Sequence, residues 1–125
     1  MAALPPAVQE AWDNRKGPAV FATVDADGSP NVIYVGCLGR RGDDVLVVAD
    51  NYFDKTRRNI EAGSKGSFLF MGQDGKPYQV KGSVEYHTEG AVFDDMKRWN
   101  PEKHPGHAAA ALKVEAVYSG AERLS

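Results

Sequence analysis

Short runs of β-forming residues, separated by turn residues, are the feature that most restricts how this 125-residue chain can fold. The run 19–24 (AVFATV) is followed by the segment DADG at 25–28, and the run 67–71 is followed by the segment QDGK at 73–76. Asp and Gly in such segments favour tight turns between strands. Because strands joined by tight turns pair antiparallel, we expect an antiparallel sheet and no parallel α/β fold.

The same analysis extends along the whole chain and predicts six strands and three short helices. The expected strands are residues 19–24, 31–38, 45–49, 67–71, 78–88 and 112–118, and the expected helices are 6–15, 55–63 and 90–99. Residues 40–44 (RRGDD) are expected to form a tight connection. The pattern predicts a mainly β protein: a six-stranded antiparallel barrel with helices at its margins, in a single domain spanning residues 1–125.

Composition excludes several classes of partner. A net charge of −2 and a pI near 5.9 give no general attraction to nucleic acid or to anionic membranes. Cys37 is the single cysteine, so an internal disulfide is excluded, as fits a reducing cytoplasm. The first residues lack the charge and the apolar core of a signal peptide, and no apolar run approaches the length of a membrane span. We therefore expect a cytoplasmic protein.

A concentration of positive charge follows the third expected strand. Residues 45–49 (VLVVA) lead through a polar loop to Lys55-Thr56-Arg57-Arg58, where a helix is expected to begin. Free backbone N–H groups and the helix dipole favour a phosphate at such a place. Lys55 would supply a charge and Thr56 a hydroxyl donor. The alternative is a surface helix whose first N–H groups are capped by Asp54 and whose cations are solvated.

Other polar residues give weaker signals. His104-Pro105-Gly106-His107 has H-x-x-H spacing, but Pro and Gly prevent the helical geometry that a zinc-protease motif needs, so these residues are expected in a loop. Cys37 has no evident base partner and is expected to be a buried thiol. No spacing suggests a catalytic triad, and we predict no metal site and no catalytic side chain.

Three segments together resemble a known family. Residues 31–35 (NVIYV), residues 55–60 (KTRRNI) and the pair Gln79-Val80 follow the order found in the pyridoxamine 5′-phosphate oxidase-like, FMN-binding split barrels. The resemblance extends from about Gly17 to Tyr118, which is nearly the whole chain. It implies a split β-barrel that binds FMN at the interface of a homodimer.

The resemblance also implies which residues contact the cofactor. Lys55 and Thr56 would hold the FMN phosphate. Two strands would flank the ring and the ribityl chain, mainly through backbone groups, and one glutamine would reach the flavin of the partner subunit. Among several aromatic residues that could wall a planar ligand, the one at the end of the third helix is expected to reach a neighbouring chain. The remaining cofactor-binding candidates are Val32, Tyr34, Val35, Val48, Ala49, Asp50, Gln79 and Trp99.

On this basis the chain is expected to be a small redox flavoprotein that transfers electrons or a hydride through FMN, with donor and acceptor undefined. The resembled oxidases are longer and carry substrate residues in a C-terminal extension, so oxidation of pyridoxamine phosphate is not expected. One alternative is a non-catalytic barrel that binds haem through His87 or His107, or binds a phosphorylated metabolite. An oligonucleotide-binding barrel is disfavoured because the chain has no basic stripe.

Overall fold

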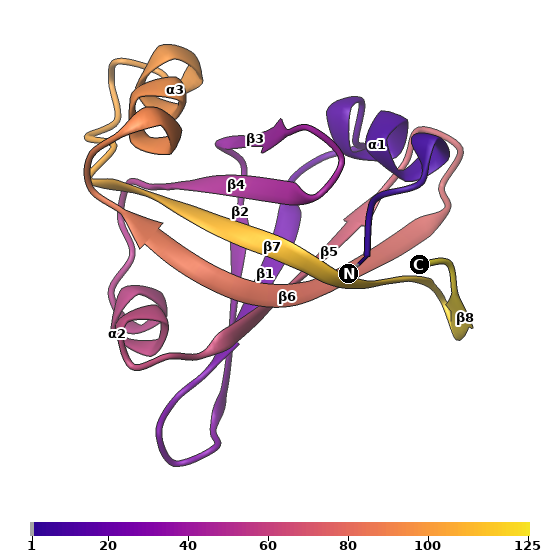
Figure 1. Cartoon of the computed structure of the whole chain (residues 1–125), viewed down its shortest axis with the longest axis horizontal. Coiled ribbons are helices and arrows are strands. Elements are labelled where there is room, and N and C mark those ends of the chain that lie inside the picture. Colours follow the sequence, from indigo (N-terminus) through magenta and orange to yellow (C-terminus); the bar gives the residue numbers. More distant parts are fainter. Residues whose placement is uncertain (1) are drawn as a thin grey trace.

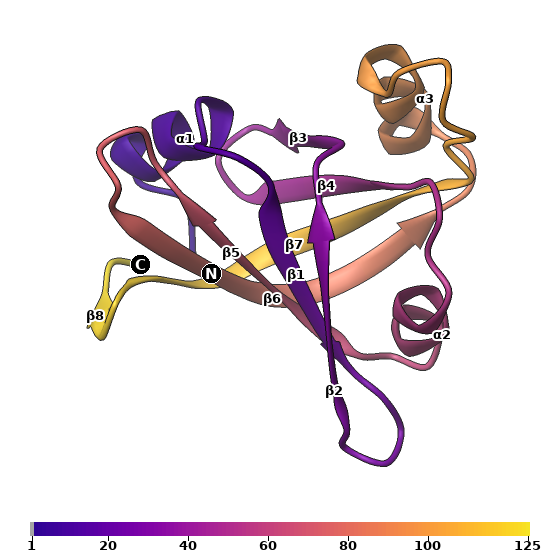
Figure 2. The same ribbon diagram turned by 180° about the vertical axis from the view of Figure 1, so that it is seen from behind.

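The computed structural model describes residues 2–125, which form one antiparallel sheet and three helices (Figures 1 and 2). The helices are α1 (Pro6–Asp13), α2 (Lys55–Glu61) and α3 (Ala91–Trp99). The strands are β1 (Ala19–Val24), β2 (Pro30–Val35), β3 (Leu38–Arg41), β4 (Val45–Asp50), β5 (Lys65–Met71), β6 (Pro77–His87), β7 (Ala108–Ser119) and β8 (Glu122–Arg123). None of the helices within residues 2–125 combines the length and the apolar character needed to cross a membrane.

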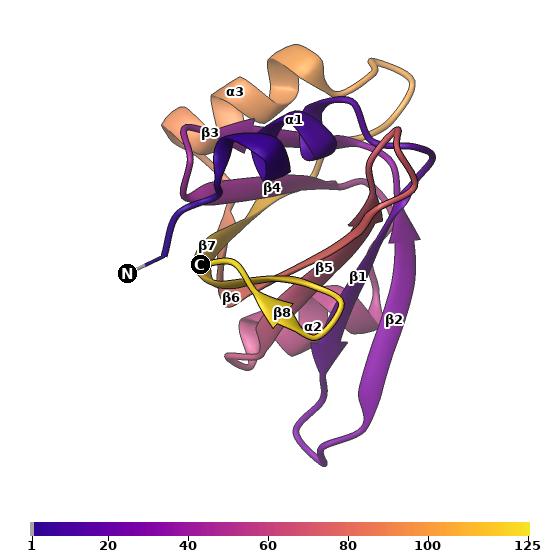
Figure 3. The ribbon, with the colours of Figure 1, turned by 90° about the vertical axis from the view of Figure 1, so that its right-hand side faces the viewer.

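The sheet must curl, because its two edge strands are neighbours in the sequence. The strand order is β2-β1-β5-β6-β7-β4-β3, so β2 and β3 lie at opposite edges, yet only Gly36 and Cys37 separate them in the chain. Figure 3 shows the resulting half-barrel from one end. In the described part of the chain, the ladder of β2 runs along β1 and that of β3 runs along β4. The barrel is therefore split between β2 and the β3–β4 hairpin.

The expected elements are found with one main difference, in the number of strands. The prediction of six strands is wrong: seven form the continuous sheet, and the short β8 pairs with β7. The expected strand 31–38 ends at Val35, and a separate strand, β3, begins at Leu38. Arg40 and Arg41 belong to β3, where they lie opposite Leu46 and Val45, and are not part of a connection. Their polar sequence is that of an edge strand, which resembles a turn when read alone.

Aromatic side chains fill the inside of the barrel. The ring of Trp12 from α1 packs edge-on against Phe68 and Phe70 of β5, with ring centroids 5.2 and 5.0 Å apart. Its indole Nε1–H donates to the carbonyl of Gly39 at 3.1 Å, so α1 is fixed over one end of the barrel. A second cluster lies outside the barrel, where Met96 of α3 packs on Ala109 and Ala111 of β7. Small residues in β7 allow α3 to approach the sheet closely.

Apolar side chains are exposed on the outer side of β1, β2 and β5, which we call the outer sheet face. Register places Tyr34, Val20, Leu69 and Gln79 side by side in one row across β2, β1, β5 and β6. Alternate residues of the strands share this face because strand side chains alternate in direction. Its exposed large apolar residues are Val24, Val32, Tyr34, Leu69 and Met71. An apolar face of this kind is typical of a surface that another chain covers.

Gly82 is required where β6 and β7 shift register. A Cβ atom at this position would overlap the carbonyl oxygen of Lys113 and lie 2.9 Å from Leu112 Cδ2. We therefore predict that Gly82→Ala lowers the free energy of unfolding by about 3 kcal/mol, measured by urea denaturation. Gly36→Ala is the matched control, because a Cβ there meets nothing within 4 Å. Equal stability of the two variants would contradict this close approach of β6 to β7.

Candidate functional site

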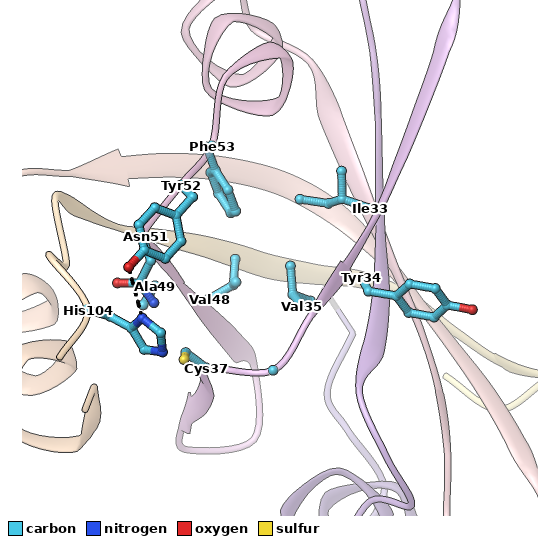
Figure 4. A pocket seen from close by; sticks show the side chains of 11 residues that line it. Ile33, Tyr34, Val35, Cys37, Val48, Ala49, Asn51, Tyr52, Phe53 and His104 are labelled. Carbon is cyan, nitrogen blue, oxygen red and sulfur yellow. Dashed lines mark hydrogen bonds between the residues drawn. The ribbon is translucent and has the colours of Figure 1, made fainter. Parts of the chain in front are cut away.

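A pocket of about 350 Å³ opens in the split of the barrel. Its walls come from the end of β2, the two-residue link to β3, the end of β4 with the following loop, and the loop that precedes β7 (Figure 4). Its volume lies within the range of small-molecule sites, roughly 300–1,000 Å³. The lining residues are Ile33, Tyr34, Val35, Gly36, Cys37, Val48, Ala49, Asn51, Tyr52, Phe53 and His104. We call this cavity the split pocket.

The split pocket has one apolar side and one polar side (Figure 4). Ile33 and Phe53 present hydrocarbon and aromatic surface, together with Val35 at the end of β2 and Val48 of β4. Opposite them lie Tyr52 and His104, whose hydroxyl and Nδ1 are 3.1 Å apart, together with an asparagine and the cysteine. Such a pocket suits a planar ligand with one apolar end and one hydrogen-bonding end.

The loop after β4 is fixed by a buried carboxylate. Asp50, only 1% exposed, accepts the backbone N–H of Phe53 through Oδ1 at 2.9 Å and the hydroxyl of Tyr86 through Oδ2. Burial, followed by this hydrogen bond to Asp50, raises the pKa of Tyr86 above its usual range. The neutral phenol therefore remains a donor, and Phe53 is held at the pocket wall.

A second pocket, which we call the cationic pocket, lies farther along β2 and shares no lining residue with the split pocket. It measures about 310 Å³, and its lining includes two cations, Lys55 and Arg58, and one carboxylate, Asp25, beside Asn31 and Asn59. Asn31 and Ile33 are alternate residues of β2, so their side chains point to the same side of the strand, about 7 Å apart. A ligand lying along β2 would thus reach from the split pocket to the cationic pocket.

The side chain of Asp54 pairs with Arg58 and does not cap helix α2. Although this residue precedes α2, its side chain makes no capping hydrogen bond, so the alternative of a helix capped by Asp54 is wrong. Its Oδ1 instead accepts from Arg58 at 2.8 Å, an exposed ion pair. Lys55 has no carboxylate partner within 4.0 Å in the part of the chain described. With Arg58 paired to Asp54, Lys55 is the cation of this pocket that remains available to an anion, while the carboxylate of Asp25 accepts the backbone N–H groups of Asp27 and Ser29.

Thr56 faces the protein interior and lines neither pocket. Its Oγ1 accepts from Asn31 Nδ2 at 2.9 Å, and only 2% of the residue is exposed. Thr23 accepts from Asn59 Nδ2 at 3.0 Å in the same cluster. The structure thus separates the pair named in the sequence: Lys55 lies in the cationic pocket, and Thr56 joins α2 to the strands beneath it.

The other residues expected at the cofactor are divided between two faces of the sheet. Four of them line the split pocket: Tyr34, Val35, Val48 and Ala49. The side chain of Tyr34 nevertheless points away from the cavity in Figure 4, so only its backbone faces the pocket.

Val32 and Gln79 lie elsewhere, on the outer sheet face, where Gln79 is in the same row as Tyr34. Trp99 packs within its own chain, since a Cβ at Gly39 would lie only 2.7 Å from its ring. The single chain therefore brings neither Gln79 nor Trp99 into the split pocket.

Two polar residues of the pocket, Asn51 and His104, did not stand out in the sequence. His104 was expected only as a loop residue, and its place here depends on contacts between segments about 50 residues apart. Cys37 was expected to be buried, but it is partly exposed at the pocket. The two histidines considered for haem, His87 and His107, are not part of this lining.

Comparison with known proteins identifies the family. The model of the pyridoxamine 5′-phosphate oxidase family matches residues 4–120, which is most of the chain. The chain belongs to this family. Solved structures of the same fold include a protein that binds FMN and a protein that stores haem.

Three of these structures cover nearly the whole chain. HupZ of Group A Streptococcus, in a His-to-Ala variant, is 26% identical over 92% of this chain and 98% of its own, with a TM-score of 0.80. An FMN-binding protein of Syntrophomonas wolfei is 22% identical over 94% of this chain and 87% of its own, with a TM-score of 0.76. HutZ, the haem storage protein of Vibrio cholerae, is 18% identical over 94% of this chain and 95% of its own, with a TM-score of 0.67. The last two likenesses establish a shared fold.

The hydrogen bond from the hydroxyl of Tyr86 to Asp50 is expected to stabilise the fold, and this contribution can be measured. Tyr86→Phe should lower the free energy of unfolding at neutral pH by about 1–3 kcal/mol, because it leaves one oxygen of buried Asp50 without a donor. Since the folded-state pKa of Tyr86 is raised, its contribution is complete below about pH 10 and is lost as the pH rises further. Urea denaturation at neutral pH and at about pH 11 should show the gap between wild type and variant narrowing. A gap that widened at high pH would contradict this assignment.

Proposed function

We propose that this protein is a small redox flavoprotein that binds FMN in the split pocket. The observation that carries the proposal is the position of the cationic pocket. It lies beyond the split pocket along β2 and contains Lys55, which forms no ion pair with a carboxylate in residues 2–125. FMN has matching parts: a flat ring system for the split pocket, a short polyol chain to follow β2, and a phosphate for the cationic pocket. Family membership and the FMN-binding neighbour of the same fold support the choice of ligand.

The residues present fit FMN in three parts. The isoalloxazine ring would lie against Ile33, Val48 and Phe53 in the split pocket. The ribityl chain would follow β2, close to the backbone of its last residues, and Lys55 would form a charge-assisted contact with the phosphate. Val35 and Ala49 would complete the wall beside the ring, and buried Asp50 would act indirectly by fixing the loop that carries Phe53.

When bound, FMN supplies the redox chemistry, because its ring accepts and passes on electrons or a hydride. The contribution of this chain is to bind the ring, orient it and shield one side from water. The apolar wall performs the shielding, and the fixed loop after β4 keeps the geometry constant. This division of labour requires no acid or base from the protein, and we infer none.

We further propose that two copies associate through the outer sheet face. The five exposed apolar residues of that face would then be buried, as in an ordinary protein interface. Gln79 lies on this face and not in the pocket of its own chain. Its amide would therefore reach the flavin of the partner subunit, where it offers both a donor and an acceptor.

Haem is the second candidate ligand, and a specific residue favours considering it. His104 lines the split pocket, and an imidazole nitrogen is a common axial ligand of haem iron. The haem storage protein HutZ shares the fold. FMN remains our first choice because Lys55 lies in a separate pocket farther along β2, which suits a phosphate at the end of a ribityl chain better than the two short propionates on the edge of haem. A yellow preparation that releases FMN would support FMN, and a red preparation with a Soret band would support haem.

The phosphate contact can be tested with two flavins. Lys55→Ala should weaken FMN binding by about 1.5–3 kcal/mol while leaving riboflavin binding nearly unchanged, because only FMN carries the phosphate. Flavin fluorescence titration measures both affinities. Lys113→Ala is the control, since Lys113 is an exposed lysine that lines neither pocket. Equal losses for FMN and riboflavin would show that Lys55 does not hold the phosphate.

The proposed dimer can be tested on its exposed face. Leu69 is 47% exposed on the outer sheet face, so Leu69→Lys should convert a dimer into a monomer by placing a charge in the interface. Sedimentation equilibrium measures the mass, and Glu10→Lys, on an exposed position of α1, should remain dimeric because α1 packs on the inner side of the barrel. A monomeric wild-type protein, or a dimer that tolerates Leu69→Lys, would refute this surface as the interface.

A further inference from the structure

The loop between α3 and β7, residues 100–107, contributes His104 to the polar side of the split pocket. It follows a helix that packs on the outside of the barrel, and it is remote in sequence from every other segment of the pocket. Figure 4 shows His104 from this loop beside Tyr52, on the side of the pocket opposite Ile33. Something must hold the loop there, because a free loop would not present one imidazole at a fixed position.

A reciprocal pair of amides supplies that connection. Asn51 Nδ2 donates to Asn100 Oδ1 at 3.1 Å, and Asn100 Nδ2 donates to Asn51 Oδ1 at 2.9 Å. The backbone N–H of Gly106 donates to the same Asn51 oxygen at 2.9 Å. Both asparagines are buried, at 8% and 7% exposure. We call this arrangement the amide clasp, formed by Asn51, Asn100 and Gly106.

Further contacts fix the C-terminal end of the loop. Lys97 Nζ donates to the carbonyls of Pro105 and Gly106 at 2.9 and 3.3 Å, and the N–H of His107 donates to the carbonyl of Asp50 at 2.8 Å. Gly106 has φ +56°, and a Cβ there would lie 2.9 Å from Lys97 Nζ, so the clasp depends on glycine at this position. The loop is thus attached to the same end of β4 that carries the pocket wall.

A buried pair of amides fixes the relative orientation of the two segments that carry it, because its hydrogen bonds form in only one arrangement. Two apolar residues could fill the same space, but they would not select one register between the loop and β4, whereas fully paired amides do. Asn51 itself lines the split pocket, so the clasp and the ligand site share a residue. The position of His104 is therefore set by the clasp, and one ring nitrogen, Nδ1, is engaged by Tyr52. The other ring nitrogen, Nε2, has no hydrogen-bond partner among residues 2–125 and is available to a ligand.

We propose that His104 is the residue of this chain that recognises the polar edge of the bound flavin, and that the amide clasp is the element that positions it. The inference rests on the proposed function and adds the orientation of the flavin ring in the split pocket. The pyrimidine edge of the ring would face His104 and Asn51, and the dimethylbenzene edge would face the apolar wall at Ile33 and Phe53. Nε2 of His104 would hydrogen-bond a heteroatom of that pyrimidine edge.

The test compares variants of one loop by FMN fluorescence titration and by the midpoint potential of the bound flavin. His104→Ala should weaken FMN binding about tenfold, since a hydrogen bond of about 1.4 kcal/mol corresponds to this factor. It should also shift the potential, because the lost bond touches the ring itself. His104→Gln retains a donor and an acceptor and should restore affinity to within about threefold of wild type. His107→Ala is the matched control, because His107 is exposed and lines no part of the pocket.

The clasp is tested by Asn100→Ala, which changes no residue of the pocket lining. It should weaken FMN about as much as His104→Ala does, and the double variant should lose no more than either single one, because both changes remove the same contact. Circular dichroism at the titration temperature establishes that each variant is folded. Additive losses would refute the positioning role of the clasp.

Two outcomes separate this inference from the proposed function. If wild type binds FMN and His104→Ala binds it equally well, or if His104→Gln is as weak as His104→Ala, the recognition role of His104 is wrong while the FMN site stands. If wild type does not bind FMN at all, the proposed function fails and this inference fails with it.

Discussion

The constraint on which the whole structure depends is the short link between the two edges of the sheet. Gly36 and Cys37 alone connect β2 to β3, and these strands end the sheet on opposite sides. A flat sheet would separate its edges by the width of several strands, at about 4.8 Å for each pair. The sheet is therefore forced to curl until its edges nearly meet. The gap that remains is the split pocket, so the position of the candidate site follows directly from the topology.

Three separate devices then give the gap its chemical character. The carboxylate of Asp50 fixes the loop after β4, and the amide clasp attaches the loop before β7. The cluster around Thr56 joins α2 to the strands and leaves Lys55 at the adjoining cavity. Each device consists of buried polar groups whose hydrogen bonds are satisfied, which rigidifies the surrounding segments. The pocket is thus built mainly from fixed loops on a curled sheet, a common arrangement for ligand sites.

Much of this fold was predictable from the sequence because local patterns specify most of it. The β-forming run of β1, the turn residues after it and the helix expected at residues 6–15 each agree with the final structure, apart from small shifts of boundary. β3 was missed because Arg40 and Arg41 are polar and stand next to Gly42, a pattern shared by edge strands and turns. The family, once recognised from the order of three segments, was confirmed by the match over residues 4–120.

The candidate site was less predictable, because its residues are brought together by contacts distant in sequence. Lys55 was expected at an anion site and lies in a cationic pocket, but the hydroxyl of Thr56, one residue later, is turned inward by Asn31. His104 could not be placed at all without knowing that Asn100 pairs with Asn51, 49 residues away. Local periodicity contains no information about such a pair. Sequence patterns therefore located the strands that frame the site better than the loops that complete it.

The most direct test of the central claim is a crystal structure of the wild-type protein grown with FMN. The account predicts the flavin ring in the split between β2 and β4, against Val48 and Phe53, with the phosphate within hydrogen-bond distance of Lys55 Nζ. Flavin found outside the split, or bound there with its phosphate directed away from Lys55, would contradict it.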